Sequence, residues 1–242
     1  AKINRVYVDR VHVKKAFAEY TAAYNADDRK IKLKIDHTYR VAALCERIAK
    51  AAGMCAYDVE LAWLSGMLHD VGRFEQIKRY NTFTDADSVD HAKFGADLLF
   101  KDGLISTFLN GMVKCTGYKS GALEDRYSSD GVFLYDRLNK SDMEMLELAI
   151  RCHNMYRIPQ GLNSREQAFC NVLRDADKVD IFKVNIDTPL EEIYNTTTEE
   201  LMKSNITDEV LEAFDEEHCI LKAIRRTPAD TVIGHVSLAY EL

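Results

Sequence analysis

The sequence has little of what interrupts helices. Three prolines and eleven glycines are spread over 242 residues. No stretch shows the sustained alternation of apolar and polar residues that half-buried strands require. Residues that favour helices, namely Ala, Leu, Glu and Lys, are abundant instead. We therefore predict an all-α protein built as a helical bundle.

The chain also lacks the marks of several protein classes. No apolar run has membrane-spanning length and no stretch resembles a signal peptide, so we expect a cytoplasmic protein with no membrane partner. The net charge of −7 disfavours a general surface for a nucleic-acid polymer. The six cysteines show no CxxC spacing and fall mostly on apolar helical faces, which predicts reduced core thiols. Kinases and serine hydrolases are disfavoured because neither a glycine-rich phosphate loop nor a serine-nucleophile motif is present.

Amphipathic helices are predicted one after another along the chain. Their approximate ranges are 11–25, 30–52, 57–69, 89–99, 104–115, 141–150 and 164–184. Capping-box patterns, Ser141 with Glu144 and Ser164 with Gln167, mark two of the helix starts. The stretch TGYKSGALEDRYSSDG predicts a long loop. Without repeats or a linker, we predict one domain over residues 1–242 with a C-terminal helical extension from about residue 190.

Four of the seven histidines continue the apolar face of a predicted helix, each on a different helix. Residues three, four, seven and eight apart share a helix face. By this rule His37 shares a face with Val41 and Leu44, and His69 continues the face of Leu61. His91 precedes Phe94 and Leu98, and His153 follows Leu146 and Ile150. These four imidazoles are predicted to point inward.

A single inward histidine is best interpreted as a core residue that donates to a backbone carbonyl. Four of them with inward carboxylates favour a metal site, because coordination offsets the cost of burying such groups. The remaining histidines, His12, His218 and His235, are not accompanied by other inward histidines or carboxylates, and we interpret them as structural residues.

Two segments offer the carboxylates. Asp70 follows His69 at a helix end. In RDADKVDI, Asp177 lies four residues after Leu173 and continues its face, whereas Asp175 lies about 160° around the helix. Asp180 is close to the Asp177 face and is left open. The candidate ligands are therefore His37, His69, Asp70, His91, His153 and Asp177. This mixed set suits Mn²⁺, Fe²⁺, Co²⁺, Ni²⁺ or Zn²⁺, and it is large enough for one or two ions.

The order H…HD…D resembles the HD-domain superfamily of metal-dependent phosphohydrolases. The matching segments are DHTYRV with His37, LHDVGR with His69 and Asp70, and RDADKVD with Asp177, across about residues 30–185. The resemblance implies an all-helical bundle with the metal site at its centre. Its activity would be hydrolysis of a phosphate ester by a metal-activated water, with a nucleotide or another small phosphorylated metabolite as substrate.

Two further segments are similar to binuclear members such as the HD-GYP phosphodiesterases. His91 in DHAKFGADLL matches their H-x-x-x-G segment, and His153 takes the place of their next histidine. The paired histidines and the G-Y-P sequence are missing, so hydrolysis of cyclic dinucleotides is not supported.

The resemblance also implies phosphate contacts. In the dNTP triphosphohydrolase branch a lysine after the last aspartate contacts substrate, which here is Lys178, and Arg73 is a second candidate beside Asp70. Weaker candidates of the same kind are Arg40, Lys32, Lys34 and Arg79. Two alternatives to hydrolysis stay open: a binuclear-iron oxygenase resembling myo-inositol oxygenase, and, less favoured, a sensory domain without activity. A homodimer is also left open.

Overall fold

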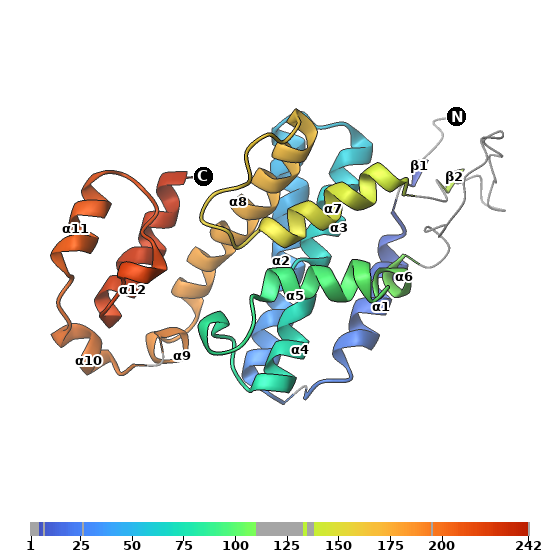
Figure 1. Ribbon diagram of the computed structural model, residues 1–242. Coiled ribbons are helices and arrows are strands. Elements are labelled where there is room, and N and C mark those ends of the chain that lie inside the picture. The colour runs from blue at the N-terminus through green and yellow to red at the C-terminus, as the bar shows by residue number, and fades with distance from the viewer. Residues whose placement is uncertain are drawn as a thin grey trace. The chain divides into compact units, whose positions relative to one another are not determined.

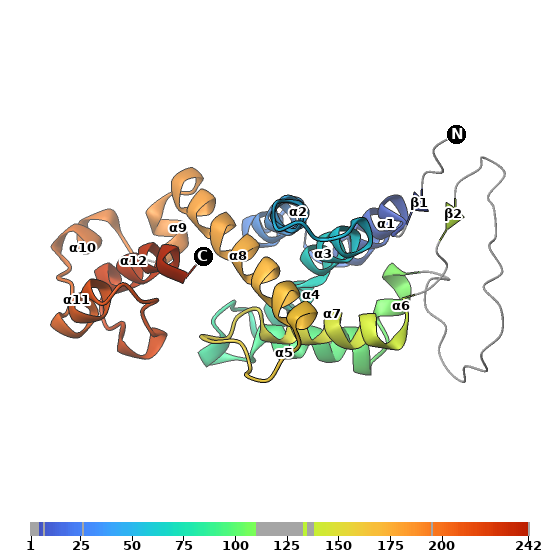
Figure 2. The same ribbon diagram turned by 90° about the horizontal axis from the view of Figure 1, so that it is seen from above.

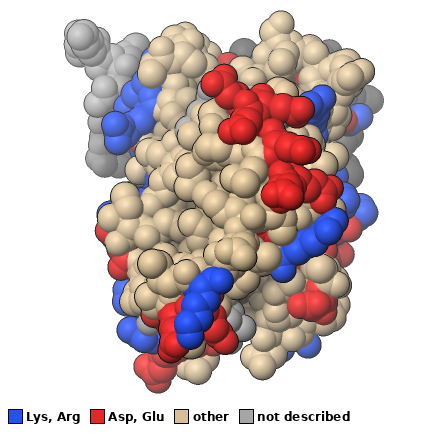
Figure 3. Space-filling model, turned by 90° about the vertical axis from the view of Figure 1, so that its left-hand side faces the viewer, with Lys and Arg blue, Asp and Glu red and all other residues tan. Residues whose placement is uncertain are grey.

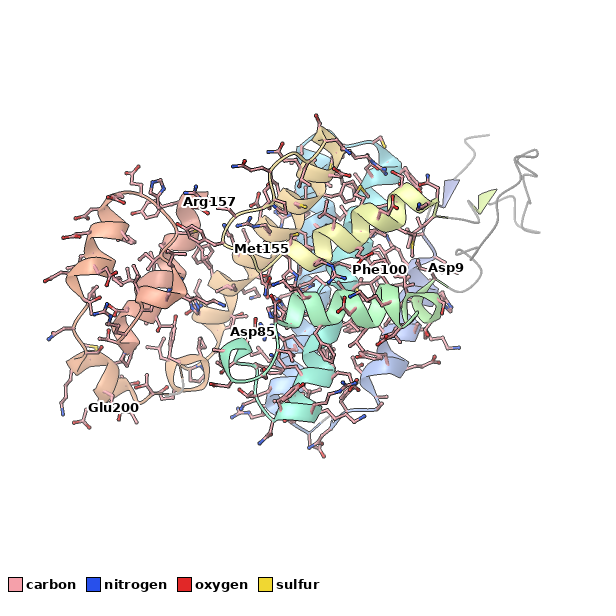
Figure 4. All side chains as sticks on the ribbon, in the orientation of Figure 1. Asp9, Asp85, Phe100, Met155, Arg157 and Glu200 are labelled. Carbon is pink, nitrogen blue, oxygen red and sulfur yellow. The ribbon has the colours of Figure 1, made fainter. Side chains whose placement is uncertain are left out.

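The computed structural model describes residues 5–6, 8–25, 27–109, 133–134, 138–194 and 196–241. The chain divides into two compact units. The first comprises Ala1–Asn154 and Ile158–Leu173, and the second comprises Met155–Arg157 and Arg174–Leu242. Figure 4 labels Met155 and Arg157, which mark the short segment that belongs to the second unit. The predicted loop over residues 116–131 lies outside the described residues.

In its described residues, the first unit has helices and one short strand pair, and the low Pro and Gly content predicts the helices. Its helices are α1 (Arg10–Thr21), α2 (Arg29–Ala51), α3 (Ala56–Leu68), α4 (Val71–Tyr80), α5 (His91–Ala96), α6 (Ile105–Phe108), α7 (Lys140–Cys152) and the beginning of α8 (Ser164–Asp187). A 3₁₀ turn, η1 (Asp85–Asp87), precedes α5, and a π-helical turn, η2 (Asp97–Lys101), continues it. The strands β1 (Arg5–Val6) and β2 (Phe133–Leu134) pair in parallel.

Helices α2 and α3 lie side by side, and α5 packs against both α4 and α7 (Figures 1 and 2). Phe17 of α1 and Phe74 of α4 are fully buried and meet edge to face with ring centroids 5.9 Å apart. Apolar side chains at helical spacing on each element fill the space between the helices, which is what the sequence periodicity predicts. Within the described residues, no helix has both the length and the apolar character needed to cross a bilayer.

The second unit is also helical. It contains the rest of α8, then α9 (Leu190–Tyr194), α10 (Thr198–Lys203), α11 (Asp208–Asp215), η3 (Lys222–Ile224), α12 (Pro228–Val236) and η4 (Ser237–Glu241). Figure 3 shows a face on which acidic side chains gather. Exposed acidic residues of α11 and the turn after it are Asp208, Glu209, Glu212, Asp215, Glu216 and Glu217. The division between the units falls within α8, whereas the sequence placed the start of the C-terminal extension near residue 190.

One helix was not anticipated. The helix predicted over residues 57–69 is α3, which ends at Leu68, but the sequence did not predict the separate helix α4 that runs from Val71 to Tyr80. Val71, Phe74 and Ile77 form the buried face of α4. Gly72 lies inside α4, and its lack of a side chain has a packing role described below.

The residues that cap α7 and α8 precede the predicted Ser141 and Ser164. Asn139, not Ser141, caps α7 by accepting from the Asp142 amide. At α8, Asn163 Oδ1 accepts from the Glu166 amide at 3.0 Å, and Glu166 accepts from the Asn163 amide at 3.0 Å. Asparagine is as good an N-cap as serine, so the residue nearer the true helix start takes the role.

Candidate metal centre

One helix interior and several helix ends bring four histidines and one aspartate together in the first unit. His37 lies within α2, His69 follows the last residue of α3, and Asp70 precedes the first residue of α4. His91 begins α5 and His153 follows the last residue of α7. All five are buried, each no more than 5 % exposed. The inward orientation predicted for the four imidazoles is thus found.

Glycines allow the helices to approach closely enough for this arrangement. A Cβ on Gly66 would lie 2.6 Å from the Ala42 Cα, so only a glycine lets α3 contact α2 at this point. A Cβ on Gly72 would lie 2.6 Å from the His91 carbonyl oxygen. Both obstacles are backbone atoms, which cannot rotate away. The first contact sets His69 near His37, and the second sets Asp70 near His91.

The five side chains form two groups of three that share Asp70. In the first, His37 Nε2 and His69 Nε2 are 3.3 Å apart, and they lie 3.5 and 3.6 Å from Asp70 Oδ2. In the second, His91 Nε2 and His153 Nε2 are 3.1 Å apart, and they lie 3.6 and 3.8 Å from Asp70 Oδ1. Each carboxylate oxygen of Asp70 therefore faces its own pair of imidazoles.

The opposite ring nitrogen is fixed in three of the imidazoles. His69 Nδ1 lies 2.8 Å from the Gly66 carbonyl, and His153 Nδ1 lies 2.7 Å from the Ile150 carbonyl. His91 Nδ1 lies 2.7 Å from Asp85 Oδ2. Since carbonyls and carboxylates accept, these Nδ1 atoms donate, and in the neutral ring Nε2 is then left with a lone pair. Such an outer acceptor is the usual support of a metal-binding histidine.

The charge states suit a cation. Burial favours the neutral acid at Asp70, but nearby positive charge, first that of Lys34 and then that of Arg73, holds the pKa of Asp70 well below its usual value. Burial, reinforced by the Arg73 charge, lowers the pKa of His91 to about 4. Near neutral pH the centre thus contains an ionised carboxylate and a neutral His91.

These residues fit a divalent metal ion. Two ligands each about 2.1 Å from one ion, at angles near 90–110°, lie about 3.0–3.4 Å apart. The separations above are close to that range. Moreover, His91 and His153 place two acceptor nitrogens 3.1 Å apart, which is unfavourable unless a cation or a shared proton lies between them. His37, His69 and Asp70 could hold one ion, and Asp70, His91 and His153 a second.

A polar network outside the ligands holds His91. Arg73 Nη1 donates to Asp85 Oδ1 at 2.8 Å, to Gln76 Oε1 at 2.9 Å and to the Phe83 carbonyl at 2.6 Å. Figure 4 labels Asp85 in the segment between α4 and α5. Asp85, Asp90 and His91 also form a group close enough to hold an ion. We interpret this group as support for His91, because its Nδ1 proton is directed at Asp85.

Two other predicted site residues belong to the second unit. Asp177 and Lys178 belong to the part of α8 that falls in the second unit. Asp177 and Asp175 are half-buried, and Asp180 is 1 % exposed, so burial does not single out Asp177. Lys178 Nζ lies 3.3 Å from the Glu241 carbonyl and 3.8 Å from Cys219 Sγ. The ligand role of Asp177 and the phosphate contact of Lys178 stay predictions.

The remaining candidate phosphate contacts differ in their exposure and in their ion-pair partners. Arg40 is half-buried on α2, and its phosphate contact also stays a prediction. Lys32 is exposed and pairs with Asp36 at 2.8 Å, and Arg79 pairs with Glu75 at 2.9 Å. Lys34, by contrast, donates to Asp70 Oδ2 at 2.7 Å.

Sequence reasoning missed Asp85 and understated Lys34. Asp85 lies in the short 3₁₀ turn η1, six residues before His91, and a single turn is too short to show α-helical periodicity. For Lys34 a signal was present, because it lies one helical turn before His37 and hence near the same face.

Comparison with known proteins identifies the family. The HD domain profile matches residues 35–182, which is more than half of the chain. No curated protein and no solved structure gave a significant match. The matched segment includes all five residues of the centre, together with Asp177 and Lys178. The chain therefore belongs to the HD-domain family, within a superfamily of metal-dependent hydrolases.

Proposed function

We propose that this protein hydrolyses a phosphate ester, with a nucleotide or another small phosphorylated metabolite as substrate. The proposal rests on the position of the Asp70 carboxylate. Each of its two oxygens faces a separate pair of buried imidazoles. A centre of this kind has neutral nitrogen ligands and one shared anion, which suits divalent ions such as Mn²⁺, Co²⁺ or Ni²⁺.

The chain's residues have separable roles in this proposal. His37, His69 and Asp70 would hold one ion and His91 and His153, with Asp70, a second. Asp177 is a further candidate ligand. A bound ion would lower the pKa of a coordinated water and polarise a phosphoryl oxygen.

The surrounding residues orient the ligands and carry positive charge. Asp85 holds the His91 ring in place through Nδ1. Lys34 and Arg73 bring positive charge to the edges of Asp70, at 2.7 and 3.7 Å from its oxygens. Positive charge beside the ions favours an anionic substrate such as a phosphate ester.

Phosphate release tests the proposal. The full chain is incubated with a panel of nucleotides and sugar phosphates in the presence of Mn²⁺, Co²⁺ or Ni²⁺. We expect release by the wild type and none by Asp70→Asn, which keeps the shape of the side chain but removes its charge. Asp87→Asn is the matched control, because Asp87 is an exposed carboxylate in η1. Equal release by Asp70→Asn would contradict the proposal.

A binuclear-iron oxygenase is the second candidate. It is supported by the second group of ligands, because a hydrolase with a single ion does not require both His91 and His153. Iron content after growth in iron-supplemented medium, together with oxygen consumption on polyol substrates, separates the two functions. Phosphate release with no oxygen consumption favours the hydrolase.

A further inference from the structure

Two cations lie at the edge of the shared carboxylate, one at each oxygen. Lys34 Nζ is 2.7 Å from Asp70 Oδ2, which is the oxygen that faces His37 and His69. Arg73 Nε is 3.7 Å from Asp70 Oδ1, which faces His91 and His153. Only the lysine is within hydrogen-bond distance.

The two cations differ in how firmly they are held. The Arg73 guanidinium is fixed by three acceptors of its Nη1 group, and its side chain is 13 % exposed. Lys34 extends from α2, one turn before His37, with a side chain that is 21 % exposed. Its flexible four-carbon stem lets the ammonium move without a change in the helix.

The position of Lys34 conflicts with an ion on the same side. An ion held by His37, His69 and Asp70 Oδ2 needs the lone pairs of that oxygen, to which the ammonium already donates. The ion would also bring two positive charges beside a third in a buried site, where charges are weakly screened.

We infer that Lys34 is an internal competitor of the metal ion on the His37–His69 side: its ammonium holds Asp70 Oδ2 in the metal-free protein and must withdraw for the ion to bind. The cost of this withdrawal makes the two sides unequal in metal affinity. This inference rests on the proposed metal centre, but it does not depend on substrate hydrolysis.

The test is the affinity of the metal-free full chain for Mn²⁺ alone, measured by titration calorimetry. Lys34→Met keeps the stem and removes the charge, so we expect Mn²⁺ to bind at least about tenfold more tightly than to the wild type, the value of a charge-assisted hydrogen bond. Lys34→Arg keeps a cation and should bind as the wild type does. Lys32→Met is the matched control on the same helix, and it should leave the affinity unchanged.

The direction of the change separates competition from a structural role. If Lys34 merely held the centre together, Lys34→Met would weaken Mn²⁺ binding, and that result would overturn the inference. An unchanged Mn²⁺ affinity of Lys34→Met would also overturn it. So would equal gains in affinity for Lys34→Met and Lys34→Arg. Lys34→Gln repeats the test with a neutral donor. If the neutral variants are unstable without metal, the rise in Tm caused by Mn²⁺ replaces calorimetry, and it should exceed that of the wild type.

The outcomes also distinguish this inference from the proposed function. Tighter Mn²⁺ binding by Lys34→Met without phosphate release by any form supports the competition and contradicts the hydrolase. Phosphate release by the wild type, with no gain in the Mn²⁺ affinity of Lys34→Met, supports the hydrolase and contradicts the competition. Absence of Mn²⁺ binding by both wild type and Lys34→Met would overturn the inference.

Discussion

The Nε2 atoms of His91 and His153 lie 3.1 Å apart although both rings already direct Nδ1 at an acceptor, Asp85 in one case and the Ile150 carbonyl in the other. Two neutral rings in these tautomers present only lone pairs to each other. The repulsion is relieved when a cation lies between them. The arrangement of His91 and His153 is therefore more favourable with a bound cation than without one.

Metal binding should therefore stabilise the folded protein. Mn²⁺ added at about one hundred times its dissociation constant should raise the free energy of unfolding by about 2.7 kcal/mol, since an ion that binds only the folded state shifts the equilibrium by mass action. Thermal unfolding with and without chelator measures the effect. Asp70→Asn should abolish the increment, and an unchanged Tm with Mn²⁺, Co²⁺, Ni²⁺ and Zn²⁺ alike would contradict the prediction.

Asp85 should contribute to metal affinity without being a ligand of the shared centre. Asp85→Asn leaves the side chain the same size but removes the charge that faces the His91 Nδ1–H at 2.7 Å. We expect Mn²⁺ affinity to fall about 10- to 100-fold, the usual effect of removing such an outer partner. Titration calorimetry of Asp87→Asn, in the same turn, provides the comparison and should match the wild type.

Gly72 should be intolerant of even one methyl group. In Gly72→Ala the new Cβ would lie 2.6 Å from the His91 carbonyl and 2.7 Å from the Gly95 amide nitrogen, so α4 and α5 must separate. We expect a loss of stability of about 1–3 kcal/mol, as for an overpacked core, and weaker Mn²⁺ binding. Urea unfolding and calorimetry measure the two effects.

Gly53→Ala is a useful comparison for this variant. Gly53 has a φ of +72° and open space around its Cβ position. Its replacement should cost about 1 kcal/mol through backbone strain while leaving metal affinity unchanged. If both variants behaved alike, close packing at Gly72 would not be the reason for its effect.

His235 should make the protein less stable in mild acid. Burial, with the charges of Arg225 and Lys222, lowers the pKa of His235 to about 4, against about 6.5 in an unfolded chain. The unfolded chain takes up the proton first, so stability is lost as the pH falls from about 6.5 to about 4. Between pH 7 and pH 5 the loss should be at most about 2 kcal/mol.

Urea unfolding at pH 7 and pH 5, followed by circular dichroism, checks this prediction. His235→Gln should have a smaller pH dependence than the wild type. His218→Gln replaces an exposed histidine and should retain the full dependence. The same slope in all three proteins would exclude His235 as the source.

Much of the centre could be predicted from helical phase. An imidazole that continues an apolar stripe must point inward, and this placed His37, His69, His91 and His153 correctly. Phase could not reveal Asp85, which lies in a 3₁₀ turn too short to show a period. Nor could it explain Gly72, since the requirement for a glycine arises from the backbone of α5 rather than from the local conformation of α4.

The boundary between the compact units was outside the reach of the sequence for a related reason. Residues 164–187 form one helix with one capping signal, and a continuous apolar pattern gives no indication that its two parts pack in different units. Only long-range contacts distinguish Leu173 from Arg174.

Sharing one carboxylate also limits how such a centre can change by mutation. Replacing His91 or His153 would leave His37, His69 and Asp70 intact, so a protein with two ions could become one with a single ion in one step. Replacing Asp70 removes the anion from both groups at once. The two histidine pairs are therefore separable from each other, whereas both groups depend on Asp70.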